Sequence, residues 1–62
     1  MKRGDIIELI YQAAGSGKIS QRHVRILRVT ESYVNAYCYK RGGIRIFRRS
    51  GILATHVIRL AS

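Results

Sequence analysis

Residues 33–40 read YVNAYCYK and alternate strictly between two kinds of side chain. The small apolar residues Val34, Ala36 and Cys38 share one parity, and the tyrosines and Asn35 share the other. Successive side chains of a β-strand point to opposite faces of the sheet, so this alternation predicts a strand with one buried face. The RGG that follows predicts a hairpin turn, and the IRIFRR after it predicts the return strand, residues 44–49.

The rest of the chain reads as further short strands between glycine and serine turns. Residues 5–14 are rich in Ile, Leu and Tyr and predict a strand, although their Glu, Leu, Gln and Ala leave a short helix as the alternative. The GSGK of residues 15–18 is a turn by composition. Residues 19–30 predict a long strand, and residues 55–61 a last one, after a short turn or single helical turn at 50–54.

The long strand contains an irregularity. Its apolar positions change phase between Ile26 and Leu27, which predicts a β-bulge or a strong bend. Five short strands in 62 residues, without a long helix, are typical of a small β-barrel. We therefore predict one all-β domain over residues 1–62, a small five-stranded SH3-like or Sm-like barrel. A five-stranded oligonucleotide-binding barrel usually needs more residues.

The chain is short and has few covalent means of stabilisation. A domain of this size buries only about 60% of its unfolded surface. Cys38 is the single cysteine, so no internal disulfide forms, and a lone thiol is typical of a reducing, cytoplasmic compartment. His23, His56 and Cys38 do not have the spacing of a zinc site. Oligomerisation or docking on another chain remains as a source of stability.

Charge is the strongest compositional signal. Twelve Lys and Arg, nine of them Arg, face three acids, which gives a net charge of +9. Arginine is suited to forked contacts with phosphates and to stacking on flat rings, and a strongly basic small domain is typical of a nucleic-acid binder. A generic solvated basic surface is the alternative. There is no basic amphipathic helix and no long apolar run, so no membrane partner is expected.

Several segments at fixed spacing resemble the WYL domain family. The strand Ser32-Tyr33-Val34-Asn35-Ala36-Tyr37-Cys38 stands where the family has its Trp-Tyr-Leu-x-Ala-Tyr-Cys strand. Arg41 and then Arg45-Ile46-Phe47-Arg48 follow at the family's distances. Upstream, Leu9-Ile10-Tyr11, Gly17 and Ser20-Gln21-Arg22 occur in the family's order, so the similarity covers residues 6–57. Ser32 and Val34 replace the Trp and Leu of the naming triplet.

The resemblance implies an Sm-like β-barrel and a regulatory role. WYL domains usually follow a winged helix-turn-helix as the effector-sensing part of a bacterial or phage transcription regulator. Some bind single-stranded DNA or RNA, or are thought to sense nucleotide ligands. This chain has no room for a helix-turn-helix, so we expect a stand-alone, sensor-type module whose partner is a nucleic acid or a nucleotide-like anion.

The candidate binding residues follow from this comparison and from their chemistry. Arg22, Arg41 and Arg45 occupy the family's basic positions and are expected to converge on one phosphate. Tyr33 and Tyr37 share a strand face and are either a stacking platform for bases or core, whereas Tyr11 and Phe47 are predicted to be core. The predicted nucleic-acid or anion site comprises Ser20, Arg22, Tyr33, Tyr37, Arg41, Arg45 and Arg48.

Catalysis is not expected. Asp5, Glu8 and Glu31 are the only acids, and none pairs with a histidine at an interpretable spacing. We therefore predict a binding protein without catalytic residues, metal or cofactor. A protein-interaction module, which self-associates as a homo-oligomer or pairs with a transcription regulator, is the alternative function, since a small barrel leaves open strand edges.

Overall fold

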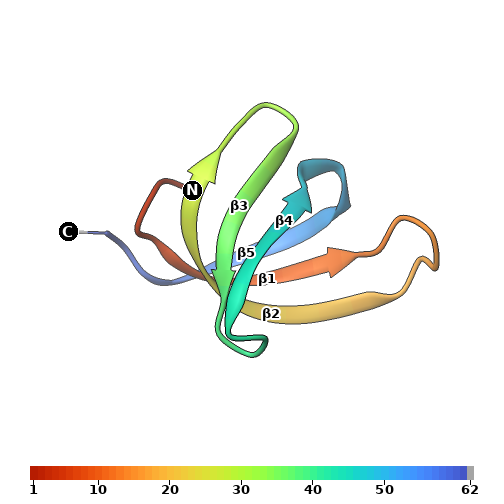
Figure 1. The fold of residues 1–62 in the computed structure, drawn as a ribbon, viewed down its shortest axis with the longest axis horizontal. Coiled ribbons are helices and arrows are strands. Elements are labelled where there is room, and N and C mark those ends of the chain that lie inside the picture. The colour runs from red at the N-terminus through yellow and green to blue at the C-terminus, as the bar shows by residue number, and fades with distance from the viewer. Residues whose placement is uncertain (62) are drawn as a thin grey trace.

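The computed structural model describes residues 1–61, which form an all-β protein (Figure 1). The segment near the N-terminus is the predicted strand and not the alternative short helix. The turn or helical turn predicted at residues 50–54 is a 3-10 turn at residues 49–51, and residues 52–54 belong to the last strand. The strands are β1 (Ile6–Gln12), β2 (Ile19–Val29), β3 (Tyr33–Cys38), β4 (Gly43–Arg48) and β5 (Ile52–Arg59), and the 3-10 turn η1 (Arg49–Gly51) joins the last two.

All five strands belong to one antiparallel sheet with the order β4-β3-β2-β1-β5. The all-β, five-stranded prediction is therefore confirmed. The sheet is not closed into a barrel, because β4 and β5 are its two edges and do not pair. The charges on these strands do not favour closure: Arg45 and Arg48 lie on β4, Arg59 lies on β5, and neither strand carries an acid.

One irregularity of the sheet lies in β2. The register with β3 shifts between Ile26 and Arg28, so Leu27 has no partner on β3. An unpaired residue of this kind is a β-bulge, which bends its strand and increases its twist. β2 accordingly curves from β1 round to β3 (Figure 1). The predicted irregularity at Ile26 and Leu27 is confirmed.

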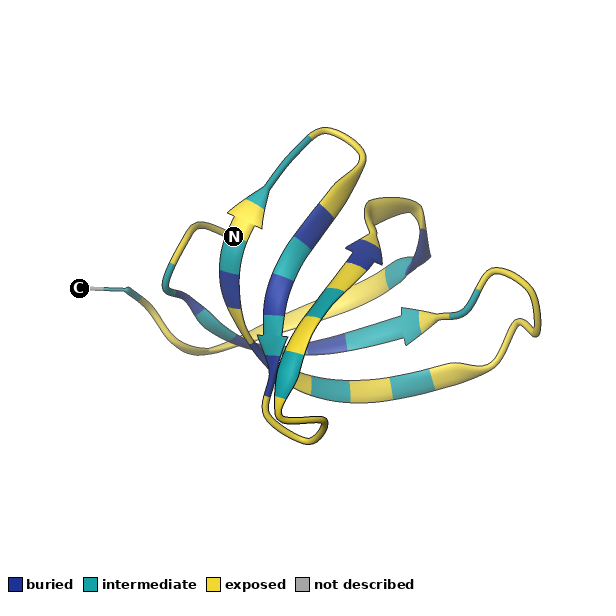
Figure 2. Cartoon of the chain, viewed as in Figure 1, coloured by how far each residue is buried: buried dark blue, intermediate teal, exposed yellow. Residues whose placement is uncertain are grey.

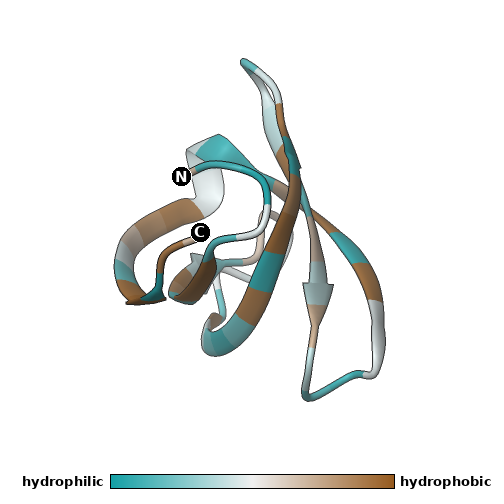
Figure 3. Ribbon diagram, turned by 90° about the vertical axis from the view of Figure 1, so that its left-hand side faces the viewer, coloured by the Kyte–Doolittle hydropathy of each residue, from teal (hydrophilic) through white to brown (hydrophobic). Residues whose placement is uncertain are grey.

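The core lies on one face of this curved sheet. Buried and more exposed residues alternate along the strands (Figure 2), and so do hydrophobic and hydrophilic ones (Figure 3). We call the core-bearing side the inner face and the other side the outer face. The buried hydrophobic residues are Ile7, Leu9, Val24, Ile26, Val34, Ala36, Cys38 and Phe47.

Side chains join β1 to β4, which are not neighbours in the sheet. The ring of Tyr11 packs edge-on against Phe47 with centroids 5.1 Å apart, and its hydroxyl accepts a hydrogen bond from the Arg48 backbone N–H at 3.3 Å. Phe47 is buried and Tyr11 partly buried against the core, as predicted. Gly51 lies against the same ring, and a Cβ there would come within 2.8 Å of Tyr11 Cε1. The turn η1 therefore needs glycine at this position.

Candidate functional site

The site begins where β2 extends past β3. The last residue pair between these strands is Val24 with Cys38, whereas β2 already begins at Ile19. Residues 19–23 are therefore paired with β1 on one side only, and the β1–β2 arm projects beyond the rest of the sheet (Figure 1). The turn after β3, residues 39–42, lies beside this overhang, and the Tyr39 backbone N–H donates to the His23 carbonyl at 3.2 Å.

Two adjoining pockets lie between the overhang and the turn, and we call them together the hairpin pocket. One, of about 490 Å³, is lined by Gln21, Arg22, His23, Tyr39 and Lys40. The other, of about 310 Å³, is lined by Ser20, Gln21, Arg22, Lys40 and Arg41. Gln21, Arg22 and Lys40 line both, so the two pockets adjoin at this end of the sheet.

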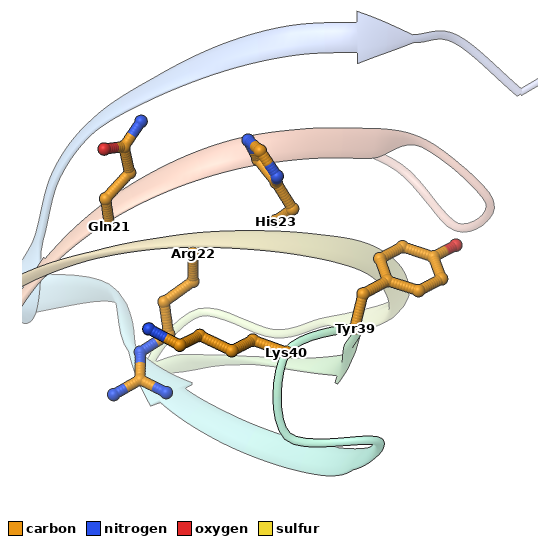
Figure 4. A pocket seen from close by; sticks show the side chains of 5 residues that line it. All are labelled: Gln21, Arg22, His23, Tyr39 and Lys40. Atoms are coloured by element: carbon orange, nitrogen blue, oxygen red, sulfur yellow. The ribbon is translucent and has the colours of Figure 1, made fainter.

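Three cationic side chains meet at the hairpin pocket. Arg22 and Lys40 point to the same side of β2, whereas Gln21 and His23 point to the other (Figure 4). Arg22 Nε donates a hydrogen bond to Ser20 Oγ at 3.3 Å, which holds the guanidinium and leaves the Ser20 hydroxyl proton available as a donor. Arg41 completes the group from the hairpin turn. The pocket therefore offers an anion several hydrogen-bond donors.

No carboxylate neutralises these cations. Over residues 1–61, the one contact at salt-bridge distance is His23 Nε2 with Glu8 Oε2, at 3.1 Å, which is an ion pair only when His23 is protonated. The hydrogen bond from His23 is the main reason that the pKa of Glu8 is below its ordinary value. Asp5 is occupied elsewhere, because it accepts hydrogen bonds from the backbone N–H groups of Lys2 and Ala61. Like charges that converge without a counter-ion are expected to attract an anion.

Cys38 is the last residue of β3, directly before the turn that lines the pocket, and its side chain is buried. Burial raises its pKa, but hydrogen bonds from the Arg41 and Lys40 backbone and from the Arg22 side chain outweigh this effect. The pKa of Cys38 is consequently below its ordinary value. The prediction of a buried thiol is confirmed, and the cause of the lowered pKa is the same group of donors that lines the pocket.

Arginine and tyrosine residues also meet on the outer face, across β2, β3 and β4. Arg25 is opposite Tyr37, and Tyr33 is opposite Arg48. Between them Arg28 is opposite Asn35. Residues directly opposite on neighbouring strands have Cβ atoms about 4.5–5.5 Å apart, so these pairs are in reach of one another. We call this surface the arginine–tyrosine face: Arg25, Arg28, Tyr33, Asn35, Tyr37 and Arg48.

The predicted binding residues thus divide between the two sides of the sheet. Ser20 and Arg22 line the hairpin pocket and share the parity of the buried Val24, whereas Tyr33, Tyr37 and Arg48 belong to the arginine–tyrosine face. Arg41 meets Arg22 in the pocket, as expected. Arg45 does not: it is opposite Ala36 on the inner face and lines neither part of the hairpin pocket.

The prediction that Tyr33 and Tyr37 lie two residues apart on one face, at about 6.6–7 Å, is wrong. Tyr33 and Tyr37 share a face, but Asn35 lies between them, so their Cα atoms are about 13 Å apart in an extended strand and they are not consecutive positions. Tyr37 instead packs edge-on against Tyr39, with ring centroids 5.5 Å apart. Tyr39 is about half exposed, at 47%, and lines the hairpin pocket. Tyr39 therefore connects the cations of the pocket to the outer face.

Sequence reasoning missed Lys40, Tyr39 and His23 as parts of the site. Tyr39 continues the parity of Tyr37, and Lys40 is next to Arg41, so both signals were present in the sequence. The length of the overhang was not, since it depends on where β3 ends. In the described part of the chain no group of His, Cys, Asp and Glu could hold a metal ion, and no helix is long and apolar enough to cross a membrane.

A comparison of the chain with protein families, with curated proteins and with solved structures finds no match. The resemblance to the WYL family therefore stays a prediction from the sequence, and the function rests on the geometry above.

Proposed function

We propose that this protein is a nucleic-acid-binding regulatory module that takes a phosphate of a single strand into the hairpin pocket. The observation that carries the proposal is that Arg22, Lys40 and Arg41 line the hairpin pocket and that none of them is paired with a carboxylate. Arginine and lysine are the residues that hold phosphate groups, and the Ser20 hydroxyl adds a further donor.

Aromatic residues favour a single strand over a duplex. Tyr39 lies in the wall of the pocket with its ring against Tyr37, so a base attached to the bound phosphate has a ring to stack on. Unpaired bases can leave their own stack and lie on such rings, whereas the bases of a duplex are already stacked. Arg25 and Arg28 extend the positive surface along the outer face.

In this proposal the fold is a variant of the small SH3-like or Sm-like barrels in which the seam between β4 and β5 stays open. In the same proposal the domain is a module of the WYL type, is located in the cytoplasm, and acts by binding and not by catalysis. A nucleotide-like anion is the second ligand that the hairpin pocket fits, since its phosphate and base make the same two contacts.

A binding titration tests the proposal. Labelled single-stranded DNA, single-stranded RNA and duplex of equal length are titrated with the protein at two salt concentrations, with fluorescence anisotropy as the readout. We expect tighter binding of a single strand than of duplex, and weaker binding of each at high salt. Equal affinities for all three at matched salt would mean unspecific charge attraction and would contradict the stacking contribution of Tyr39.

A further inference from the structure

β5 is an edge strand that is uncovered on both of its faces. It pairs with β1 on one side and has no strand on the other. Residues 53–59 are all exposed, and Leu53, Val57 and Ile58 each keep about half of their surface, at 50%, 49% and 51%. Long, exposed, apolar edge strands are uncommon in proteins that stay monomeric, because the free edge is a template for another strand.

The opposite edge of the sheet is protected, and β5 is not. Proteins commonly protect an edge with charged side chains, proline or a very short strand. β4 is shorter and carries Arg45 and Arg48, so charge protects this edge, although Ile44 and Ile46 on it are exposed to 67% and 63%. β5 has no charged residue from Ile52 to Ile58, taking His56 as neutral at pH 7, and no proline. β5 is thus an uncharged strip on the surface of a protein with net charge +9.

The charge distribution also decides what covers β5. An acidic partner would be attracted to the hairpin pocket and to the arginine–tyrosine face, where the cations are, and not to a strip without charge. A second copy of the chain brings the same uncharged strip. A two-fold symmetric contact uses the same surface of both copies, and it adds buried apolar area, of which a small domain has little.

We propose that two copies pair through antiparallel β5 strands and form one continuous sheet. The register that we infer places Thr55 on the two-fold axis, opposite Thr55 of the second copy. Leu53 then lies opposite Val57, and Ile52 opposite Ile58, so that apolar residues meet across the junction. Arg59 lies opposite Gly51 and does not face another cation. If the register were shifted so that His56 lay on the axis, the charged Arg59 would lie opposite the apolar Leu53, and this pairing is less favourable.

The oligomeric state in solution is the first test. Sedimentation velocity of the full chain at neutral pH, from low micromolar to several hundred micromolar protein, should show a monomer that converts to a dimer. Val57→Lys should keep the protein monomeric throughout this range. Ile46→Lys is the matched control, since Ile46 is exposed to 63% on the other edge, and it should dimerise like the wild type.

Cross-linking tests the register. Directly opposite residues have Cα atoms about 4.5–5.5 Å apart, which suits a disulfide. In a Cys38→Ala background, Thr55→Cys should give a covalent dimer under mild oxidation. Arg59→Cys should not, because the two substituted positions would be eight residues apart along the junction, about 27 Å. Cross-linking of both to equal extents would contradict the register.

Salt separates this proposal from the proposed function. Added salt screens repulsion between two cationic copies and should strengthen the dimer, whereas it should weaken nucleic-acid binding. A wild-type monomer at every concentration and salt would overturn the dimer and leave the binding function untouched. Open-ended oligomers that Ile46→Lys abolishes would overturn it too, since they would join β5 of one copy to β4 of the next.

Discussion

The carboxylate of Asp5 holds the two ends of the chain together: its Oδ1 accepts a hydrogen bond from the Ala61 backbone N–H at 2.9 Å. Its Oδ2 accepts a second one from the Lys2 backbone N–H at 3.0 Å. Asp5 is only 3% exposed, so nearly all of this carboxylate is occupied by the protein. The contact lies just after the end of β5, the edge strand that pairs only with β1.

Asp5→Asn should loosen the end of β5. The amide keeps the size of the side chain but accepts less strongly and brings a donor that faces backbone N–H groups. We expect a lower midpoint of thermal unfolding and faster hydrogen exchange at Ala61 than in the wild type. Glu31→Gln, an exposed acid with no such contact, is the control and should leave both unchanged. Unaltered exchange at Ala61 in Asp5→Asn would show that the contact does not hold β5.

The same contact predicts the direction of the pH dependence. The hydrogen bond from Ala61 is the main reason that the pKa of Asp5 is below its ordinary value. A carboxyl group with a lowered pKa in the folded state stabilises the protein above its unfolded pKa, near 3.8, and the stabilisation is lost as pH falls through the folded value. Thermal stability should therefore fall in acid, and less steeply in Asp5→Asn. Part of the slope should persist, because Glu8 is shifted in the same direction.

Gly51→Ala should destabilise the fold. The added Cβ would lie 2.8 Å from the Gln12 carbonyl oxygen and 2.8 Å from Tyr11 Cε1, so the turn and the ring must move apart. A forced rearrangement of this type costs about 1–3 kcal/mol of unfolding free energy. Gly43→Ala is the control, because nothing lies within 4 Å of the added atom there. Urea unfolding of the two variants should separate them clearly, and equal midpoints would contradict the close packing at η1.

Arg41→Ala should weaken nucleic-acid binding without unfolding the protein. Arg41 lies in an exposed turn, and substitutions at such positions usually change stability by no more than about 0.5 kcal/mol. The loss of one phosphate contact should reduce the salt slope of the affinity for single strands by about 0.7. Lys2→Ala removes the same charge outside the pocket. Indistinguishable affinities and slopes for the two variants would mean that the basic surface acts diffusely and that the hairpin pocket is not a site.

Tyr39→Ala should lower the affinity for single strands more than Tyr33→Ala does. The two rings are similarly exposed, at 47% and 40%, but only Tyr39 lies in the wall of the hairpin pocket. Removal of a stacking ring costs about 1–3 kcal/mol per base, which is roughly five-fold to more than a hundred-fold in affinity. Anisotropy with a short single strand measures both variants. A larger loss for Tyr33→Ala would place the bases on the far end of the arginine–tyrosine face.

Local patterns predicted most of the fold. Alternation placed β3, the phase change at Leu27 placed the bulge, and glycines placed the hairpin turns, because these features depend on residues close in sequence. Closure of the sheet depends on whether two distant edges meet, which alternation within each strand does not encode. The extra residues at the start of β5 follow from the pairing of Ile52 with Tyr11, which is also a long-range contact.

The site was predictable in part for the same reason. Within β2, Arg22 has the parity of the apolar Val24, and within β3, Tyr37 has the parity opposite to the apolar Ala36. The division of the candidate residues between two sides could therefore be predicted from the sequence. That Arg22 meets Lys40 could not be predicted in this way. It depends on β3 ending opposite Val24, which leaves residues 19–23 of β2 without a partner on that side.

The position of Cys38 allows local opening of the protein to be measured through the reactivity of its thiol. The thiol is the only one in the chain and it is fully buried, so a reagent reaches it only after local opening. Its rate of reaction with a thiol reagent therefore measures how often the hairpin between β3 and β4 separates from β2. A phosphate held by Arg22, Lys40 and Arg41 would join β2 to the turn after β3 and slow that reaction. Binding of an unlabelled ligand could therefore be followed through the rate at which the Cys38 thiol reacts.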